Sequence, residues 1–360
     1  MALEPRDRYR NQSPYELFRA TARSHAPRLA FAGGQAPERW RRETLPAVVA
    51  TLGRLPERVD PRPSLIAEWE RDGVHTQKWL IDVEAGLSTT AYVNRPAEPA
   101  AERLPGILCW HGHGPRGQLF GKEPVMGDLS SPERAEFVRR TGSDYGFRMA
   151  QAGFVTFAID WMGHGDLAEH RKPNHRYFAD ADDWCNTYYM HATLLGMTPL
   201  GMNVAHGKVL VDFVSELPFV DASRLGVMGL SGGGTMTVWS AVCDDRLRAA
   251  EVVCYSDMFA DFAFRDLEDC GSQIAPGLFE LVDVPDLQGL IYPRPLLVDI
   301  AAFDETFALD SAMRCFRQVE AIYEAGGAGG AIDLNLFGDG HRWEGGRSVG
   351  FFERHLGASK

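Results

Sequence analysis

The feature that most constrains the fold is a series of short, continuously apolar runs that alternate with helical stretches. Six such runs lie at residues 105–110, 154–160, 225–229, 250–254, 295–300 and 332–337. Helical patterns between them include residues 209–214, 235–241 and 312–319. Strands that are apolar on both faces are typical of parallel sheets covered by helices on each side. The sequence therefore predicts an α/β fold with a mostly parallel central sheet and helices on both faces.

Two further segments precede this alternation. Residues 75–83 and 87–93 have strand composition and are separated by Ala85-Gly86, which predicts a hairpin. Residues 1–59 contain a helix start at Ser13-Pro14 and an apolar stripe after residue 45, which predicts an N-terminal helical extension. We expect the main domain to span residues 60–360. Within it, residues 166–200 are longer than a crossover needs and are a candidate pocket wall.

Charge and cysteine content argue against several classes of partner. The chain has 37 Lys and Arg against 49 Asp and Glu, a net charge of −12, which disfavours nucleic acids and anionic lipid surfaces. No apolar run approaches the ~20 residues of a membrane span, and the charged N-terminus has no signal-peptide core. The six cysteines form no CxxC pair. We expect a cytoplasmic protein with reduced thiols that binds neither nucleic acid nor membranes.

The strongest chemical signal follows the third apolar run. Gly229-Leu230-Ser231-Gly232-Gly233 fits the pattern G-x-S-x-G between a predicted strand and a predicted helix. This is the context of a nucleophile elbow, a sharp turn that needs small neighbours and places the serine at a helix N-terminus. We therefore expect Ser231 to be a nucleophile. A second match around Ser348 follows no strand, and we interpret it as chance.

A nucleophilic serine in this setting needs an acid and a base, which follow it in the order Ser, Asp or Glu, His. His341 comes directly after the last predicted strand and is the candidate base. Asp304 follows the strand at residues 295–300 and is the candidate acid, with Glu305 as its rival. Asp299 lies within that strand, so we expect a structural role for it.

The loop after the first run is a candidate oxyanion loop. Such a loop supplies one backbone N–H, and the residue after the nucleophile supplies the other. We expect these donors to be Gly232 and His113, with Gly114 as the alternative to His113. His111 and His113 also form a His-x-His pair that can chelate zinc. Because no third ligand is apparent from the spacing, we expect neither a metal nor a cofactor.

Two glycine-rich patterns match the dinucleotide-binding fingerprint, at residues 112–117 and 163–168. A nucleotide site would need a helix that opens at these glycines. Pro115 disfavours a helix in the first pattern, and the basic, Pro-containing run up to Pro173 disfavours one in the second. We therefore reject NAD binding.

Taken in order, these motifs resemble the α/β-hydrolase superfamily from about residue 65 onward, and within it the branch of dienelactone hydrolases and acetyl xylan esterases. The resemblance rests on residues 111–114, 160–165, 195–201, 217–226 and 290–297 together with the elbow. Two departures stand out. Ser231 replaces the cysteine nucleophile of dienelactone hydrolases, and Ala205-His206 stands where such relatives often have Trp-Asp.

The resemblance implies a serine esterase that cleaves carboxylic esters, including acetyl or other small acyl esters, with Ser231, Asp304 and His341 as its triad. Two alternatives remain. The chain could be a binding protein without turnover, or a peptidase of the prolyl-oligopeptidase type, although the N-terminal segment is too short for the propeller of those enzymes. Trp161, Trp184 and Tyr188 are candidates for the wall of the substrate pocket, and ordinary core packing is the competing interpretation.

Overall fold

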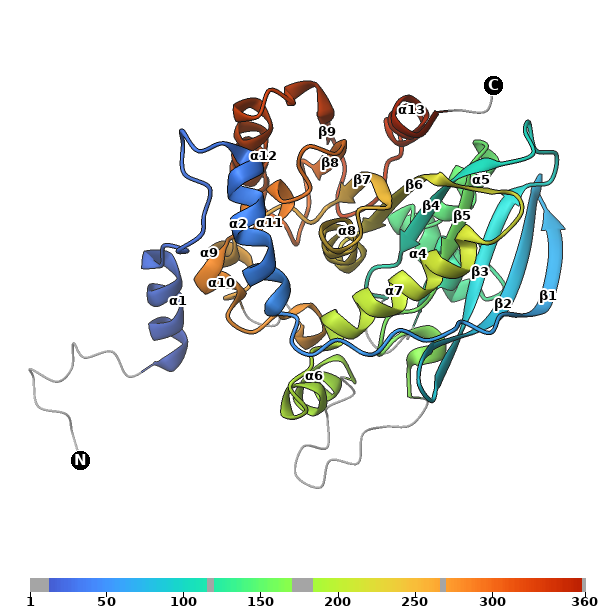
Figure 1. The fold of residues 1–360 in the computed structure, drawn as a ribbon, viewed down its shortest axis with the longest axis horizontal. Helices are drawn as coiled ribbons and strands as arrows, with labels where there is room; N and C mark the ends of the chain where they lie inside the picture. The colour runs from blue at the N-terminus through green and yellow to red at the C-terminus, as the bar shows by residue number, and fades with distance from the viewer. Residues whose placement is uncertain (1–12, 115–119, 170–183, 266–269, 358–360) are drawn as a thin grey trace, which may run out of the picture.

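The computed structural model describes residues 13–114, 120–169, 184–265 and 270–357. Its strands are β1 (Ser64–Arg71), β2 (Val74–Glu84), β3 (Leu87–Pro96), β4 (Leu104–Trp110), β5 (Val155–Ala158), β6 (Val220–Leu230), β7 (Leu247–Val253), β8 (Leu296–Ala301) and β9 (Ile332–Phe337). Within the described residues, nine strands form one sheet in the order β1-β2-β3-β5-β4-β6-β7-β8-β9 (Figure 1).

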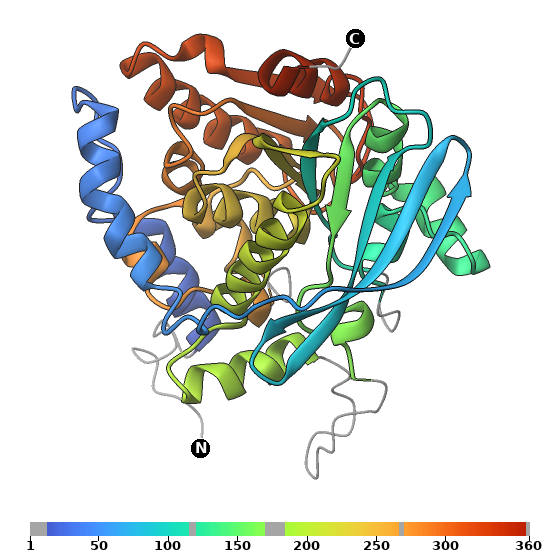
Figure 2. The same ribbon diagram turned by 45° about the vertical axis from the view of Figure 1, so that its right-hand side comes forward.

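The sheet is parallel over most of its width. The pairs β5–β4, β4–β6, β6–β7, β7–β8 and β8–β9 are parallel, whereas β1, β2 and β3 form antiparallel hairpins that project at one edge (Figure 2). All six predicted apolar runs are strands, and the hairpin at residues 75–93 is confirmed as β2 and β3. The carboxyl ends of the parallel strands face the same side, which is where ligands bind in such sheets.

Helices connect the strands and cover both faces. They are α1 (Pro14–Ser24), α2 (Pro37–Ala50), α3 (Lys122–Val125), α4 (Pro132–Thr141), α5 (Tyr145–Gln151), α6 (Trp184–Leu194), α7 (Pro199–Ser215), α8 (Gly232–Cys243), α9 (Phe259–Phe262), α10 (Leu278–Leu281), α11 (Val284–Gly289), α12 (Leu309–Ala325) and α13 (Ser348–Phe352), with short 3-10 turns η2 (Gly165–Leu167), η3 (Gly271–Gln273) and η4 (Gly329–Ala331) and a π turn η5 (Glu353–Gly357). None of the helices in the described ranges is both long and apolar enough to cross a bilayer. The cytoplasmic location stays a prediction.

The central strands send alternate side chains into two cores, as a period of two requires. On β4, Leu108 and Trp110 enter the larger core, which also contains apolar residues of α7, α8, α11 and α12. The intervening Ile107 and Cys109 enter the smaller core beneath α5 and α13. The prediction of helices on both faces is confirmed.

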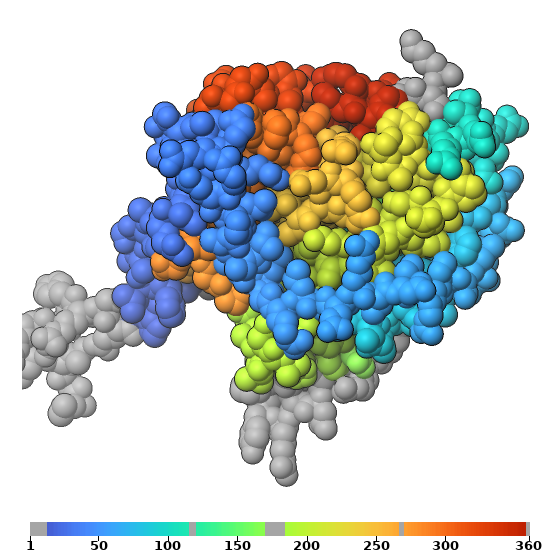
Figure 3. Space-filling view, viewed as in Figure 1, coloured from blue at the N-terminus to red at the C-terminus, as the bar shows by residue number. Residues whose placement is uncertain are grey.

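The two N-terminal helices pack on the same body. Ser13 caps α1 by accepting a hydrogen bond from the N–H of Glu16, as the sequence predicts. Trp40 and Val48 of α2 are buried in the larger core, and α2 lies against α10 and α12 (Figure 3). These helices therefore share a core with the sheet. The domain boundary at residue 59 stays a prediction.

Strand β1 was not expected from the sequence. Nearly all of its residues are exposed, including Leu65, Ile66 and Trp69. An edge strand that covers no core lacks the apolar alternation by which half-buried strands are predicted. Its partner β2 determines its place.

Candidate active site

Ser231 lies at a sharp turn between β6 and α8. Its backbone has φ 63° and ψ −121°, a conformation that costs a residue other than glycine about 1–3 kcal/mol. The turn is fixed by the N–H of Ser231, which donates to the Val253 carbonyl at 2.9 Å, and by the Ser231 carbonyl, which accepts from Gly234 at 2.7 Å. A strained serine held so firmly is the geometry expected of a nucleophile elbow.

The elbow needs glycine because backbone atoms crowd it from three sides. A Cβ on Gly229 would lie 2.4 Å from the Gly233 carbonyl oxygen, and one on Gly233 would lie 2.2 Å from the Trp110 oxygen. A Cβ on Gly112 would lie 2.6 Å from the Leu230 oxygen. These contacts explain the glycines of the sequence motif and hold the loop after β4 against the serine.

His341 and Asp304 come from loops after neighbouring strands, β9 and β8. The Nδ1–H of His341 donates to Oδ2 of Asp304 at 2.8 Å, and the Asp304 side chain is only 2% exposed. The other carboxylate oxygen of Asp304 accepts the backbone N–H groups of Thr306 and Phe307 at 2.8 and 3.0 Å. Burial opposes ionisation, but the hydrogen bonds and the attraction to His341 outweigh it and lower the pKa of Asp304. The imidazole is thus oriented by an ionised, buried carboxylate.

Glu305, the rival acid, contacts a different part of the histidine. Its Oε2 accepts the backbone N–H of His341 at 3.3 Å, and its side chain is exposed at the cavity rim. The ring of Phe307 stacks on the imidazole, with centroids 5.8 Å apart. The geometry therefore favours Asp304 over Glu305 as the partner of the imidazole.

A cavity of about 340 Å³ brings these elements together. Its lining includes Ser231 and His341, the loop residues His111, Gly112, His113 and Gly114, the apolar side chains Phe120, Val125, Phe137 and Leu230, and the charged residues Arg140, Glu305 and Arg342. The elbow, the histidine loop and the loop after β4 thus share one wall, at the carboxyl ends of β6, β9 and β4. Two of the side chains expected to act together, Ser231 and His341, face the same space.

The loop after β4 passes beside the first turn of α8. A Cβ on Gly112 would lie 3.4 Å from Cβ of Ser231, and one on Gly232 would lie 2.9 Å from Nδ1 of His113. The ring of His113 therefore packs directly over Gly232. The two residues expected to donate to an oxyanion are neighbours in space, although 119 residues separate them in the chain.

His111 is engaged by Trp161 and by its own loop. Its Nδ1 lies 2.8 Å from the indole nitrogen of Trp161 and 2.9 Å from the Gly112 carbonyl oxygen, and its Nε2 lies 3.1 Å from the backbone N–H of Trp161. Burial lowers its pKa to about 3. Because both ring nitrogens of this neutral imidazole are engaged, His111 supports the loop and is not oriented to chelate together with His113.

A buried carboxyl pair supports the loop that carries His341. Glu251 and Asp299 lie on adjacent strands, and burial raises the pKa of both. Glu251 accepts hydrogen bonds from the Trp343 indole at 3.2 Å and from Ser348 Oγ at 2.5 Å. Trp343, two residues after His341, is thereby anchored. Asp299 has the structural position expected of it, and Ser348 is buried away from the cavity.

The aromatic residues proposed for the pocket wall lie elsewhere. Trp161 is buried beneath the loop after β4, and Trp184 and Tyr188 pack on each other in α6 with centroids 5.3 Å apart. None of the three is among the described residues that line the cavity. Residues 170–183 of the predicted pocket wall lie outside the described residues.

Lys122, a buried lysine that belongs to no sequence motif, supports one wall of the cavity. Nζ of Lys122 lies 2.6 Å from Oδ2 of Asp160, 3.0 Å from Oδ2 of Asp166 and 3.3 Å from Oε1 of Glu123. Burial alone would lower the pKa of Lys122, but these carboxylates outweigh it and raise that pKa. The neighbouring residues Phe120 and Gly121 line the cavity. The ion cluster thus fixes one cavity wall to the end of β5.

We expect Lys122→Met to lower the free energy of unfolding by about 3–5 kcal/mol, because it leaves Asp160 and its neighbours buried without a counter-charge. Urea titration followed by tryptophan fluorescence measures the change. Arg39→Gln is the control, since it breaks only the exposed pair with Glu43 and should leave the free energy of unfolding nearly unchanged. A Lys122→Met protein as stable as the wild type would contradict a structural role for the cluster.

Comparisons with known proteins identify the family of this chain. A model of the Abhydrolase family matches residues 4–321. A curated protein named "Putative hydrolase YtaP", from Bacillus subtilis (strain 168), is 24% identical over 293 residues, which cover 81% of this chain and 90% of that protein.

Solved structures share the fold at low sequence identity. A "putative acetyl xylan esterase" from Bacteroides fragilis NCTC 9343 has a TM-score of 0.72 and 17% identity, covering 93% of this chain and 84% of that one. The glucuronoyl esterase from Solibacter usitatus has a TM-score of 0.64 and 14% identity, covering 94% and 100%. The fold expected from the sequence motifs is confirmed. The esterase structures share the fold of this chain. Because the family model spans most of its length, the chain belongs to the Abhydrolase family.

Proposed function

We propose that this α/β hydrolase is a serine esterase that cleaves carboxylic esters through an acyl-enzyme. Ser231 is the nucleophile, His341 the general base and acid, and Asp304 the residue that orients His341. The proposal rests above all on the hydrogen bond of 2.8 Å from His341 to Asp304, beside the cavity that Ser231 also lines. The fold likeness to esterases agrees with it.

In the first half of the reaction, Ser231 Oγ attacks the ester carbonyl carbon while Nε2 of His341 takes the hydroxyl proton. The tetrahedral intermediate collapses, its C–O bond to the alcohol breaks, and His341 returns the proton to the leaving alkoxide. Water then attacks the acyl-enzyme by the same route and releases the acid and free Ser231. Asp304 stabilises the imidazolium in both halves, which fits the lowered pKa of its carboxyl.

The oxyanion would be held by the backbone N–H groups of Gly232 and His113. Gly232 is the first residue of α8, where N–H groups have no intrahelical acceptor and the helix dipole favours negative charge. His113 packs against Gly232 from the loop after β4. Two preorganised donors of this kind contribute several kcal/mol to transition-state stabilisation.

Two rival functions are less well supported. A binding protein without turnover has no need of a serine at φ 63°, whose strain must be compensated by the rest of the fold. The fold likeness to solved esterases favours ester hydrolysis over a peptidase of the prolyl-oligopeptidase type. Ester hydrolysis therefore remains the best account of the site.

We propose a small acyl group, such as acetyl, as the part of the substrate that Ser231 takes up. The cavity volume of about 340 Å³ is at the lower end of the range for small-molecule sites, roughly 300–1,000 Å³. Its polar wall near Glu305, Arg140 and Arg342 suits an alcohol part that carries hydroxyl groups, as an acetylated sugar does.

We expect kcat/KM to be highest for acetyl and propionyl esters and to fall as the acyl chain lengthens. The first methylene that overfills the cavity should cost about tenfold or more. A panel of aryl esters from acetate to octanoate, together with acetylated xylose, measures this profile. Rising kcat/KM up to octanoate would contradict the small acyl pocket, and absence of hydrolysis across the panel would favour a binding function.

A further inference from the structure

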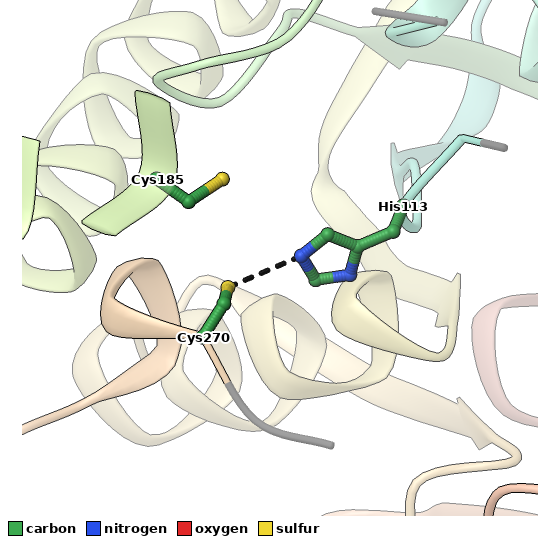
Figure 4. Close-up of side chains that lie close together, drawn as sticks. All are labelled: His113, Cys185 and Cys270. Atoms are coloured by element: carbon green, nitrogen blue, oxygen red, sulfur yellow. Dashed lines mark hydrogen bonds between the residues drawn. The ribbon is translucent and has the colours of Figure 1, made fainter. Parts of the chain in front are cut away.

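Three soft donor groups meet beside the proposed active site. His113 lies in the loop after β4, Cys185 lies in the first turn of α6, and Cys270 directly precedes η3 (Figure 4). Their ligand atoms all lie within 4.8 Å of one another, and Nε2 of His113 is 3.2 Å from Sγ of Cys270. The three segments are distant in the chain, so the fold alone creates this cluster.

The packing around the cluster fixes its donors. The ring of His113 lies edge-on to Trp161 and His164, with centroids 4.9 and 5.3 Å away. Cys185 is buried, and a Cβ on Gly163 would lie 3.3 Å from its sulfur. The backbone N–H of Gly271 donates to Oδ1 of Asn186 at 2.8 Å, which joins the segment of Cys270 to that of Cys185. The donors are therefore preorganised by contacts that do not depend on an ion.

We propose that His113, Cys185 and Cys270 form a zinc site. Ideal Zn–S and Zn–N bonds of about 2.3 and 2.0 Å in tetrahedral geometry place two sulfurs about 3.8 Å apart and a sulfur and a nitrogen about 3.5 Å apart. These ideal separations lie between the 3.2 Å that separates Nε2 of His113 from Sγ of Cys270 and the 4.8 Å within which all three ligand atoms lie. Two thiolates and an imidazole are a donor set that suits Zn²⁺.

Binding is balanced in charge and atoms. One Zn²⁺ forms two Zn–S bonds and one Zn–N bond to Nε2 of His113, while the two thiols release two protons to solvent. The resulting centre is neutral, which favours it in a partly buried position. A water molecule takes the fourth position.

The ion would position the oxyanion loop, an effect that rests on the proposed function. Nε2 of His113 faces the two cysteines, whereas its Nδ1 faces Gly232. Fixing the ring from one edge therefore fixes the backbone N–H of His113 beside that of Gly232. In this arrangement the zinc has a structural role and does not contact the reacting carbonyl.

The site is tested by cobalt, whose absorption reports its ligands. The purified chain, stripped with a chelator, should bind one Co²⁺ and develop a thiolate-to-cobalt charge-transfer band with the strong d–d bands of tetrahedral geometry, both abolished by added zinc. Cys185→Ser and Cys270→Ser should lose the charge-transfer band, wholly or in large part. Cys243→Ser, which changes a cysteine at the end of α8, should keep it. A wild-type chain without the band, or a band unchanged in both cluster variants, would overturn the proposal.

A second readout separates the zinc site from the esterase proposal. His113→Ala removes one ligand, so it should need a higher cobalt concentration for half-maximal absorption. Because it keeps its backbone N–H, it should lose about tenfold or less in kcat, well below the 10²–10³ of a lost oxyanion donor. Ser231 should still react with a fluorophosphonate in the zinc-free chain. Failure of Ser231 to be labelled in the metal-loaded chain, together with an intact cobalt band, contradicts only the esterase. Complete loss of turnover in both His113→Ala and the zinc-free wild type would overturn the positioning role in favour of a metal-activated water.

Discussion

Ser231→Ala should abolish ester hydrolysis while leaving the fold intact. Removal of a triad nucleophile lowers turnover by on the order of 10⁶. The strain at φ 63° is the same for serine and alanine, since each carries a Cβ, so the elbow should keep its conformation. Steady-state hydrolysis of an aryl acetate measures the loss, and circular dichroism checks the fold.

Labelling identifies the nucleophile independently of the substrate. A fluorophosphonate should modify Ser231 in the wild type, as located by peptide mass. The matched control is Ser348→Ala, at the other G-x-S-x-G sequence, where the serine hydrogen-bonds to Glu251. That variant should be less stable by about 1–3 kcal/mol, because Glu251 loses a buried partner, yet it should be labelled at Ser231 as before. Labelling at Ser348, or full activity of Ser231→Ala, would refute the proposed mechanism.

Strands and turns whose signal is local could be predicted from the sequence. A strand buried on both faces must be apolar throughout, so residues 105–110 and 225–229 stand out without any knowledge of their partners. The glycines around Ser231 are likewise a local requirement, since each prevents a clash within the elbow. Chain order then places His341 and Asp304 after successive strands.

Contacts between distant segments could not be predicted in this way. The spacing around His113 offers no third metal ligand, whereas the fold brings Cys185 and Cys270 to it from α6 and the turn before η3. Lys122 appears in the sequence as an ordinary solvent-exposed lysine, because its carboxylate partners Asp160 and Asp166 lie about 40 residues away. Such pairings depend on the register and curvature of the whole sheet.

The aromatic residues after β5 illustrate a related ambiguity. Trp161 follows a predicted strand end, which is equally compatible with a pocket wall and with core packing. In the structure its indole stacks on His164 with centroids 4.6 Å apart, and its backbone N–H holds His111. A side chain at a strand end can point toward the ligand or support the loops that do, and only the packed structure distinguishes the two.

The identity of the catalytic acid is the most exacting test of the triad. Asp304 and Glu305 are adjacent, yet one accepts Nδ1–H of His341 and the other accepts its backbone N–H. Asp304→Asn keeps the shape but can present an N–H to Nδ1, which favours the tautomer whose Nε2 is protonated and cannot accept the serine proton. Turnover should fall by roughly 10⁴.

Glu305→Gln is the matched control, because its amide oxygen can still accept the backbone N–H of His341. It should change turnover by less than about tenfold, since the carboxylate that it removes contacts the backbone of His341 and not the imidazole. Measuring kcat for both variants on one aryl ester, with fluorophosphonate labelling rates as a second readout, compares the two positions directly. If Glu305→Gln loses as much turnover as Asp304→Asn, the imidazole is oriented by both carboxylates. If it loses more, Glu305 is the acid, and the histidine loop must rearrange from its position against Asp304 before the reaction.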